Sequence, residues 1–264
     1  MNHAKWIAYF ERNRLDRLEP DWSAPVSISE RTFGLFLKSI EQFRLGDGGG
    51  PASLIAFDAE RFRSSTEQMR KIVDLWFAEE AEHARLLGCA VERLGGRAIN
   101  SHWSFTAFCW CRRALGVRFE LQVLLLTELV STAYYRVLRA HSPDIPVAQM
   151  CTLILRDEAG HVAFHRDRLA DSRQHVKGGS NALWRTQFCV LGLAAATMLW
   201  VNHGPCLTAI GGSRVEYFRE VRQQLRHFIV SLYQLIKGAK KEFSFARRGN
   251  PHVGKGAITG LKST

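Results

Sequence analysis

The chain has 264 residues, of which 46% are hydrophobic and 23% are charged, a composition that excludes an intrinsically disordered protein and is sufficient for a sizeable core. Its formal net charge is +11, but the segment Lys237–Thr264 holds seven Lys or Arg against one acid, so the rest is only mildly basic. No nucleic-acid-binding motif accompanies this charge, and we therefore expect no nucleic-acid partner.

The sequence gives no indication of export or membrane insertion. The N-terminal stretch MNHAKWIAYFERNRLDRLEP is amphipathic and interrupted by charges, unlike a signal peptide. The longest uncharged apolar run, Phe188–Val201, has 14 residues, which is short for a membrane span and typical of a buried helix. The six cysteines lie mostly within apolar helical pattern, which predicts buried, reduced thiols. We therefore predict a cytoplasmic protein without a transmembrane span.

Helical periodicity is nearly continuous along the chain, and strand patterns are almost absent. Breakers separate the predicted helices at GDGGGP, residues 46–51, and at Gly95-Gly96. The run Ser64-Ser65-Thr66-Glu67 is typical of a capping box, and Ser142-Pro143 is typical of a helix N-cap followed by proline. The predicted helices cover, in chain order, about residues 4–18, 29–45, 64–94, 103–112, 114–140, 142–171, 182–202 and 213–237.

This pattern predicts a single all-α domain over residues 1–237. Its bundle core would cover about residues 29–171, with extra helices at 182–237. Residues 238–264 are expected to form a basic, flexible tail.

Two Glu-x-x-His pairs occur within long predicted helices. Glu80 and His83 lie in EEAEHARLLG, and Glu158 and His161 lie in LILRDEAGHVAFH. Residues at i and i+3 share one helix face, and here that face also carries apolar residues. An isolated pair of this kind is more often an exposed helix charge than a ligand. A charged pair on an apolar face nevertheless requires compensation, and a metal ion provides it.

Glu128 strengthens this interpretation because it lies in VLLLTELVSTAYY, with apolar neighbours on nearly every side. An ionised Glu in that setting needs a counter-charge, either an internal arginine such as Arg118 or Arg136, or a metal ion that several carboxylates share. Together with the two Glu-x-x-His pairs, it favours the metal. Glu79 and Glu82, in contrast, are expected to turn away from the apolar face and to be solvated.

The order Glu80-x-x-His83, Glu128, Glu158-x-x-His161 resembles the ferritin-like di-iron carboxylate superfamily over roughly residues 30–170. In that superfamily two helices each supply one Glu and two supply Glu-x-x-His to the interior. The resemblance implies a ferritin-like four-helix bundle with additional N- and C-terminal helices. It also implies two iron ions, or an iron/manganese pair, as the cofactor, and the sequence contains no nucleotide-cofactor motif.

The first carboxylate of the pattern is open between two residues. Glu41 lies in the regular predicted helix FGLFLKSIEQF, as the superfamily usually has it. Asp47 lies at the edge of GDGGGP, and its spacing from Glu80 and the similarity of QFRLGDG to a QxxLGE-like stretch in ferritin-like proteins favour it slightly. An aspartate at this position departs from the Glu of the superfamily pattern.

The candidate metal ligands are therefore Asp47, Glu80, His83, Glu128, Glu158 and His161. Four further residues are alternatives or outer partners. Glu41 is the alternative first ligand, and Glu120 is an outer acid or, preferably, half of a salt bridge. His165, one turn after His161, is an extra ligand or an outer partner. Tyr135 would line the pocket, although such a residue is more often a core aromatic.

The resemblance makes an oxidoreductase that activates O2 towards a small organic substrate the leading functional hypothesis. The alternatives are an iron-binding or storage protein without enzyme activity and a structural helical protein with a degenerate metal site. Because no cysteine-rich electron-transfer module of the rubredoxin type is present, an oxidoreductase would need a separate electron donor. A homodimer is the expected assembly if the chain is not a monomer.

Overall fold

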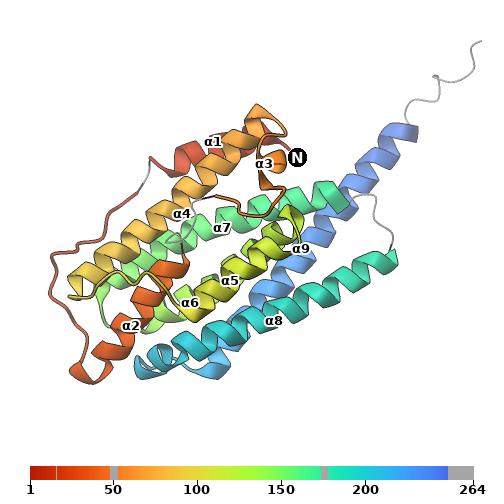
Figure 1. Ribbon diagram of the computed structural model, residues 1–264. Coiled ribbons are helices and arrows are strands. Elements are labelled where there is room, and N and C mark those ends of the chain that lie inside the picture. Colours follow the sequence, from red (N-terminus) through yellow and green to blue (C-terminus); the bar gives the residue numbers. More distant parts are fainter. Residues whose placement is uncertain (16, 48–52, 174–177, 249–264) are drawn as a thin grey trace, which may run out of the picture.

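The computed structural model describes residues 1–15, 17–47, 53–173 and 178–248 (Figure 1). All regular structure in these ranges is helical, which confirms the predicted all-α class. The helices are α1 (His3–Asn13), α2 (Glu30–Gly46), α3 (Ala59–Arg63), α4 (Glu67–Arg93), α5 (Trp103–Ala114), α6 (Val117–His141), α7 (Ile145–Arg173), α8 (Gly178–Ala209) and α9 (Arg214–Arg248).

The helix ends follow local capping chemistry. The hydroxyl of Thr66 accepts a hydrogen bond from the backbone N–H of Met69 and starts α4, two residues after the predicted Ser64. The helix stops where Gly95 adopts a φ of 67°, a left-handed conformation that glycine tolerates best. The predicted cap at Ser142 is wrong, because the carboxylate of Asp144 accepts from the N–H of Val147 and starts α7.

Helix α6 lies at the centre of the fold, where it packs against α5, α7, α8 and α9. Helix α4 packs against α1, α2 and α7. The main core gathers around α6 residues such as Leu125, Leu129 and Ala133, all fully buried. A second core lies beneath α1, which inserts Trp6 and Phe10 against α4 and α7. The space between α4, α6 and α7 is therefore closed on one side by the N-terminal helix.

Three predicted helix boundaries differ substantially from the structure, and one of them is the end of α8, which lies at Ala209 rather than near residue 202. Helix α1 ends at Asn13 rather than near residue 18. Helix α9 continues to Arg248, so the first part of the predicted flexible tail, residues 238–248, is helical. Residues 249–264, the remainder of that tail, lie outside the described residues.

Helix α8 corrects the prediction of a buried apolar helix at 182–202. Large apolar side chains on its outer face are exposed, including Leu183 (73%), Val190 (61%) and Val201 (61%). By length and hydropathy, the segment Asn181–Ala209 is the one described helix that could cross a membrane, and only 22% of its most apolar part is buried. All six cysteines are free, but only Cys151 and Cys206 are buried, so the thiols are less enclosed than predicted.

Candidate metal centre

Six acidic and imidazole side chains converge inside the fold as two triads. Their potential ligand atoms lie within 4.8 Å of one another in each triad. The first triad is Asp47, His83 and Glu158, and the second is Glu80, Glu128 and His161. These are the six residues that the sequence pattern singled out, and the open choice for the first carboxylate falls on Asp47.

Four helices position these side chains. Asp47 is the C-cap residue of α2, and Glu128 lies in the middle of α6. Helices α4 and α7 each contribute a Glu and a His at i and i+3, which places both on one face. Glu158 and the two histidines are almost completely buried.

Glu80 and Glu158 each face both histidines. The two oxygens of Glu80 lie 3.7 Å from Nδ1 of His83 and 3.1 Å from Nδ1 of His161. The two oxygens of Glu158 lie 3.8 Å from the same two nitrogens. Of the two triad histidines, Asp47 lies near His83, at 4.0 Å, and Glu128 lies near His161, also at 4.0 Å. The geometry thus separates two carboxylates that span the cluster from two that lie at its ends.

Several atoms at the centre of this cluster have no hydrogen-bond partner among the described residues. They are Nδ1 of His83, Nδ1 of His161, both carboxylate oxygens of Glu128 and Oε2 of Glu158. Buried polar atoms are almost always paired, so a group of orphans that face one another indicates a missing partner. Carboxylate oxygens and imidazole nitrogens are ligands for iron, manganese and zinc, and the cluster therefore could hold metal ions.

Each histidine contacts the acid that directly precedes the other Glu-x-x-His pair. Nε2 of His83 lies 3.2 Å from Oδ2 of Asp157, and Nε2 of His161 lies 3.0 Å from Oε2 of Glu79. Such a contact fixes the ring so that Nδ1 points into the cluster. The prediction that Glu79 is solvated is wrong, because its side chain is buried at this contact. In the sequence, an acid directly precedes the Glu of each Glu-x-x-His pair. This repeat could have indicated the two contacts, but Asp157 was not among the predicted residues.

The N-terminal segment completes this outer layer. The amide of Asn13 donates to Glu79 at 2.9 Å and to Asp157 at 2.8 Å. Arg17 donates to Asp157 at 2.8 Å. Helix α1 can approach so closely because Gly160 has no side chain, and a Cβ there would collide with the ring of Tyr9. Sequence reasoning did not find these contacts, since they depend on how α1 docks.

The protonation of the cluster reflects its burial and crowded charge. Burial raises the pKa of Glu158 well above its usual range, and it raises the pKa of Asp47 to about 6. Burial opposes charge on His83 too, but its contacts with Asp157 and Glu80 outweigh it and raise the pKa of this histidine. For Asp157, the partners His83 and Arg17 likewise overcome burial and lower the pKa. Protons thus compensate the crowded carboxylates in the metal-free protein.

The other candidates have separate roles. The hydroxyl of Tyr135 donates to Asp47, so this tyrosine contacts the cluster directly. Nε2 of His165 lies 3.4 Å from Glu128, while its Nδ1 lies 3.2 Å from a nitrogen of Arg168, and it therefore supports Glu128 from outside the triads.

Two acids that the sequence suggested lie elsewhere. Glu41 accepts a hydrogen bond from the backbone N–H of Arg97, away from the triads, so it is not the first carboxylate. Glu120 is buried in an ion pair with Arg112 at 3.0 Å, as the salt-bridge alternative predicted.

The chain matches no protein-family model, and neither the curated proteins nor the solved structures contain a match. The fold and the site alone define the class: an all-helical protein whose interior holds two carboxylate–histidine triads that could bind metal.

Proposed function

We propose that the two triads hold two metal ions, iron or an iron/manganese pair, within a ferritin-like four-helix bundle formed by α2, α4, α6 and α7. The protein would be an oxidoreductase that activates O2 towards a small organic substrate. The observation that carries this proposal is the position of Glu80 and Glu158, each of which faces both histidines and is suited to bridge two ions.

The chemistry of the donor set supports iron or manganese. Mixed carboxylate and imidazole ligation suits these metals, which supply the electron transfer to oxygen and substrate that protein side chains cannot perform. Asp47 and Glu128 would each complete one end of the site, with the imidazole Nδ1 of His83 or His161 beside it.

The surrounding residues would orient the ligands and control protons. Asp157 and Glu79 hold the two histidine rings from behind. Tyr135 holds its phenolic proton at Asp47. The apolar residues beneath α1, including Phe10 and Phe164, exclude water from the histidine side. Electrons would come from a separate donor protein.

Metal reconstitution tests this function. The purified full chain is loaded with Fe(II) without oxygen, its metal content is measured, and the absorption spectrum is followed after oxygen is admitted. We expect two irons per chain and an oxygen-dependent absorption change. Glu80→Ala and Glu158→Ala should lose both, whereas Glu92→Ala, an exposed acid of the same helix α4, should keep both.

Two outcomes would contradict the proposal. Substoichiometric metal that the two variants leave unchanged would exclude the triads as the metal site. Two irons per chain within a large closed shell, seen by size-exclusion chromatography, would favour storage over oxygen activation.

A further inference from the structure

A cleft of about 340 Å³ lies against the carboxylate side of the triads. Asp47, Glu80, Glu128 and Glu158 line it, whereas neither triad histidine does. A molecule in this cleft would therefore meet the carboxylate wall, with both imidazole rings behind it. The volume is in the range typical of small-molecule sites.

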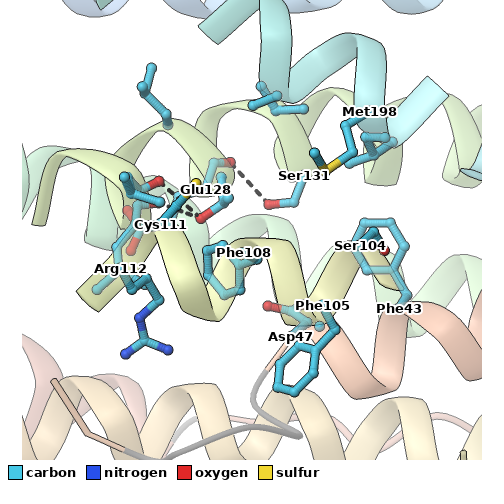
Figure 2. Close-up of a pocket in the computed structure, with 18 of the residues that line it drawn as sticks. Phe43, Asp47, Ser104, Phe105, Phe108, Cys111, Arg112, Glu128, Ser131 and Met198 are labelled. Carbon is cyan, nitrogen blue, oxygen red and sulfur yellow. Dashed lines mark hydrogen bonds between the residues drawn. The ribbon is translucent and has the colours of Figure 1, made fainter. Parts of the chain in front are cut away.

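The shape of the cleft is elongated. Its lining residues extend along α6 from Phe119 to Ser131 and along α8 from Leu191 to His203. At 1.5 Å per residue, each of these stretches covers about 18 Å. In Figure 2, Arg112 lies at one side of the view and Met198 at the other, with Glu128 and Asp47 between them. The modest volume is thus spread along a narrow path that passes the carboxylates.

The remaining wall is mostly aromatic and aliphatic. Phe105 and Phe108 of α5 project into the cleft (Figure 2), and Val130 and Leu191 are among the aliphatic residues that also line it. The only cationic side chain in the described lining is Arg112. Its charge is already used, because it contacts Glu120 at 3.0 Å and the backbone oxygen of Ser53 at 2.7 Å. The described lining of the cleft therefore offers no free cation to an anionic head group.

Apart from the triad carboxylates, one polar atom of the described lining residues has no partner. The side-chain oxygen of Gln42 is buried without a hydrogen bond in the part of the chain that the structure describes. Gln42 lies beside Phe43 on α2, five residues before Asp47, and thus about 7 Å from the carboxylate wall along the helix. An unpaired buried amide oxygen favours a ligand that donates a hydrogen bond at this point.

We propose that the cleft binds a neutral, elongated and largely apolar molecule with a hydrogen-bond-donating head group, of the long-chain alcohol class. The head group contacts Gln42, and the chain extends past Glu128 towards Phe108. This inference deepens the proposed function, because the bound chain lies against the carboxylates that would hold the metals.

Quenching of tryptophan fluorescence tests the binding directly, since Trp76 lines the cleft and donates to Glu80 at 3.1 Å. The probe is a straight-chain dodecanol with bromine at its far end, titrated into the full chain with and without iron. We expect saturable quenching that disappears in Trp76→Phe. Bromoethanol should quench without saturation, and the matching brominated dodecanoic acid should bind at least about tenfold more weakly.

Variants place the probe within the cleft. Ala195→Phe fills the lining of α8 and should abolish saturable quenching, whereas Ala182→Phe, an exposed alanine of the same helix outside the lining, should not affect it. Gln42→Leu should weaken binding of the bromoalcohol but not of bromododecane. The wild-type series of alcohol lengths needs no variant and should gain affinity with length until the cleft is full.

The outcomes separate this inference from the proposed function. Two irons per chain without saturable quenching, or equally tight binding of the acid, would overturn the cleft assignment and leave the metal proposal standing. Saturable quenching by a chain that fails to take up iron in the reconstitution would uphold the cleft assignment and overturn the metal proposal.

Discussion

Two of the buried polar clusters in the described part of the chain differ in how completely their atoms are hydrogen-bonded. In the first, the hydroxyl of Ser39 is hydrogen-bonded to the hydroxyl of Tyr134 at 2.8 Å and to Nδ1 of His203 at 2.9 Å. This cluster is neutral, because burial lowers the pKa of His203 to about 3. The second cluster, the two triads, is highly charged and leaves buried atoms such as Nδ1 of His83 and Oε2 of Glu158 without partners. Buried polar side chains that hydrogen-bond one another stabilise a fold, whereas buried polar atoms without a partner indicate a ligand site.

The largest expected effect is at the spanning carboxylate of the charged cluster. Glu158→Gln should abolish binding of both metals, because it removes a carboxylate that faces both histidines. In the metal-free protein it should leave stability unchanged or increased, since burial already disfavours the charge on Glu158. Metal analysis and thermal unfolding of the metal-free variant test the two halves of this prediction. If Glu158→Gln retained two metals, the unpaired atoms of the charged cluster would not indicate a metal site.

The second effect concerns the acids behind the histidines. Asp157→Asn and Glu79→Gln should each weaken metal binding by about 10–100-fold, because each leaves one imidazole less firmly oriented. Competition with a chelator measures the affinity. Glu82→Gln, at a half-exposed acid on the same helix as Glu79, is the matched control and should bind metal as the wild type does.

The neutral cluster should respond in the opposite way. Ser39→Ala leaves Tyr134 and His203 without their shared partner and should destabilise the protein by about 1–3 kcal/mol. Its metal content should not change. Denaturant unfolding and metal analysis of the same sample test this, and a loss of metal would mean that the two clusters depend on each other.

The last expected effect, which is the smallest when counted for a single pH unit, is an acid sensitivity that originates at His203. Its pKa is about 3 in the folded protein against an unperturbed value of 6.5, so between these pH values only the unfolded chain takes up this proton. Stability is therefore lost as the pH falls through this window, by at most about 1.4 kcal/mol for each pH unit. His203→Phe should reduce this slope in unfolding experiments on the metal-free protein. An unchanged slope would place the acid sensitivity elsewhere.

Five of the six triad residues were predictable, because the Glu-x-x-His spacing occurs twice along the chain and Glu128 stands out against apolar neighbours. The structure brings these side chains together; that they bind metal, and that the metal is iron, stays a prediction. The choice between Glu41 and Asp47 needed the structure, because both occur at suitable distances from Glu80 and only the end of α2 decides which one faces it.

The missed features depend on tertiary contacts that a periodic pattern does not contain. Glu79 is buried because α7 supplies His161 as its partner, and sequence periodicity along α4 carries no information about that partner. Helix α8 contains a long uncharged apolar run, residues 188–201, which predicted burial, but the structure covers only one side of it and leaves Val190 exposed. Helix α9 extends past residue 237 although its composition there is basic.

The contacts between the two Glu-x-x-His units have the form of an isologous interface within a single chain. The acid that precedes each Glu-x-x-His pair contacts the histidine of the other pair, as the same residues of two identical subunits would do across a twofold axis. Asn13 lies where that axis would pass and donates to both acids, although it belongs to neither unit. Arg17 breaks this symmetry, because it donates to Asp157 at 2.8 Å whereas Asn13 donates to both acids, and the two halves of the centre are therefore chemically distinguishable.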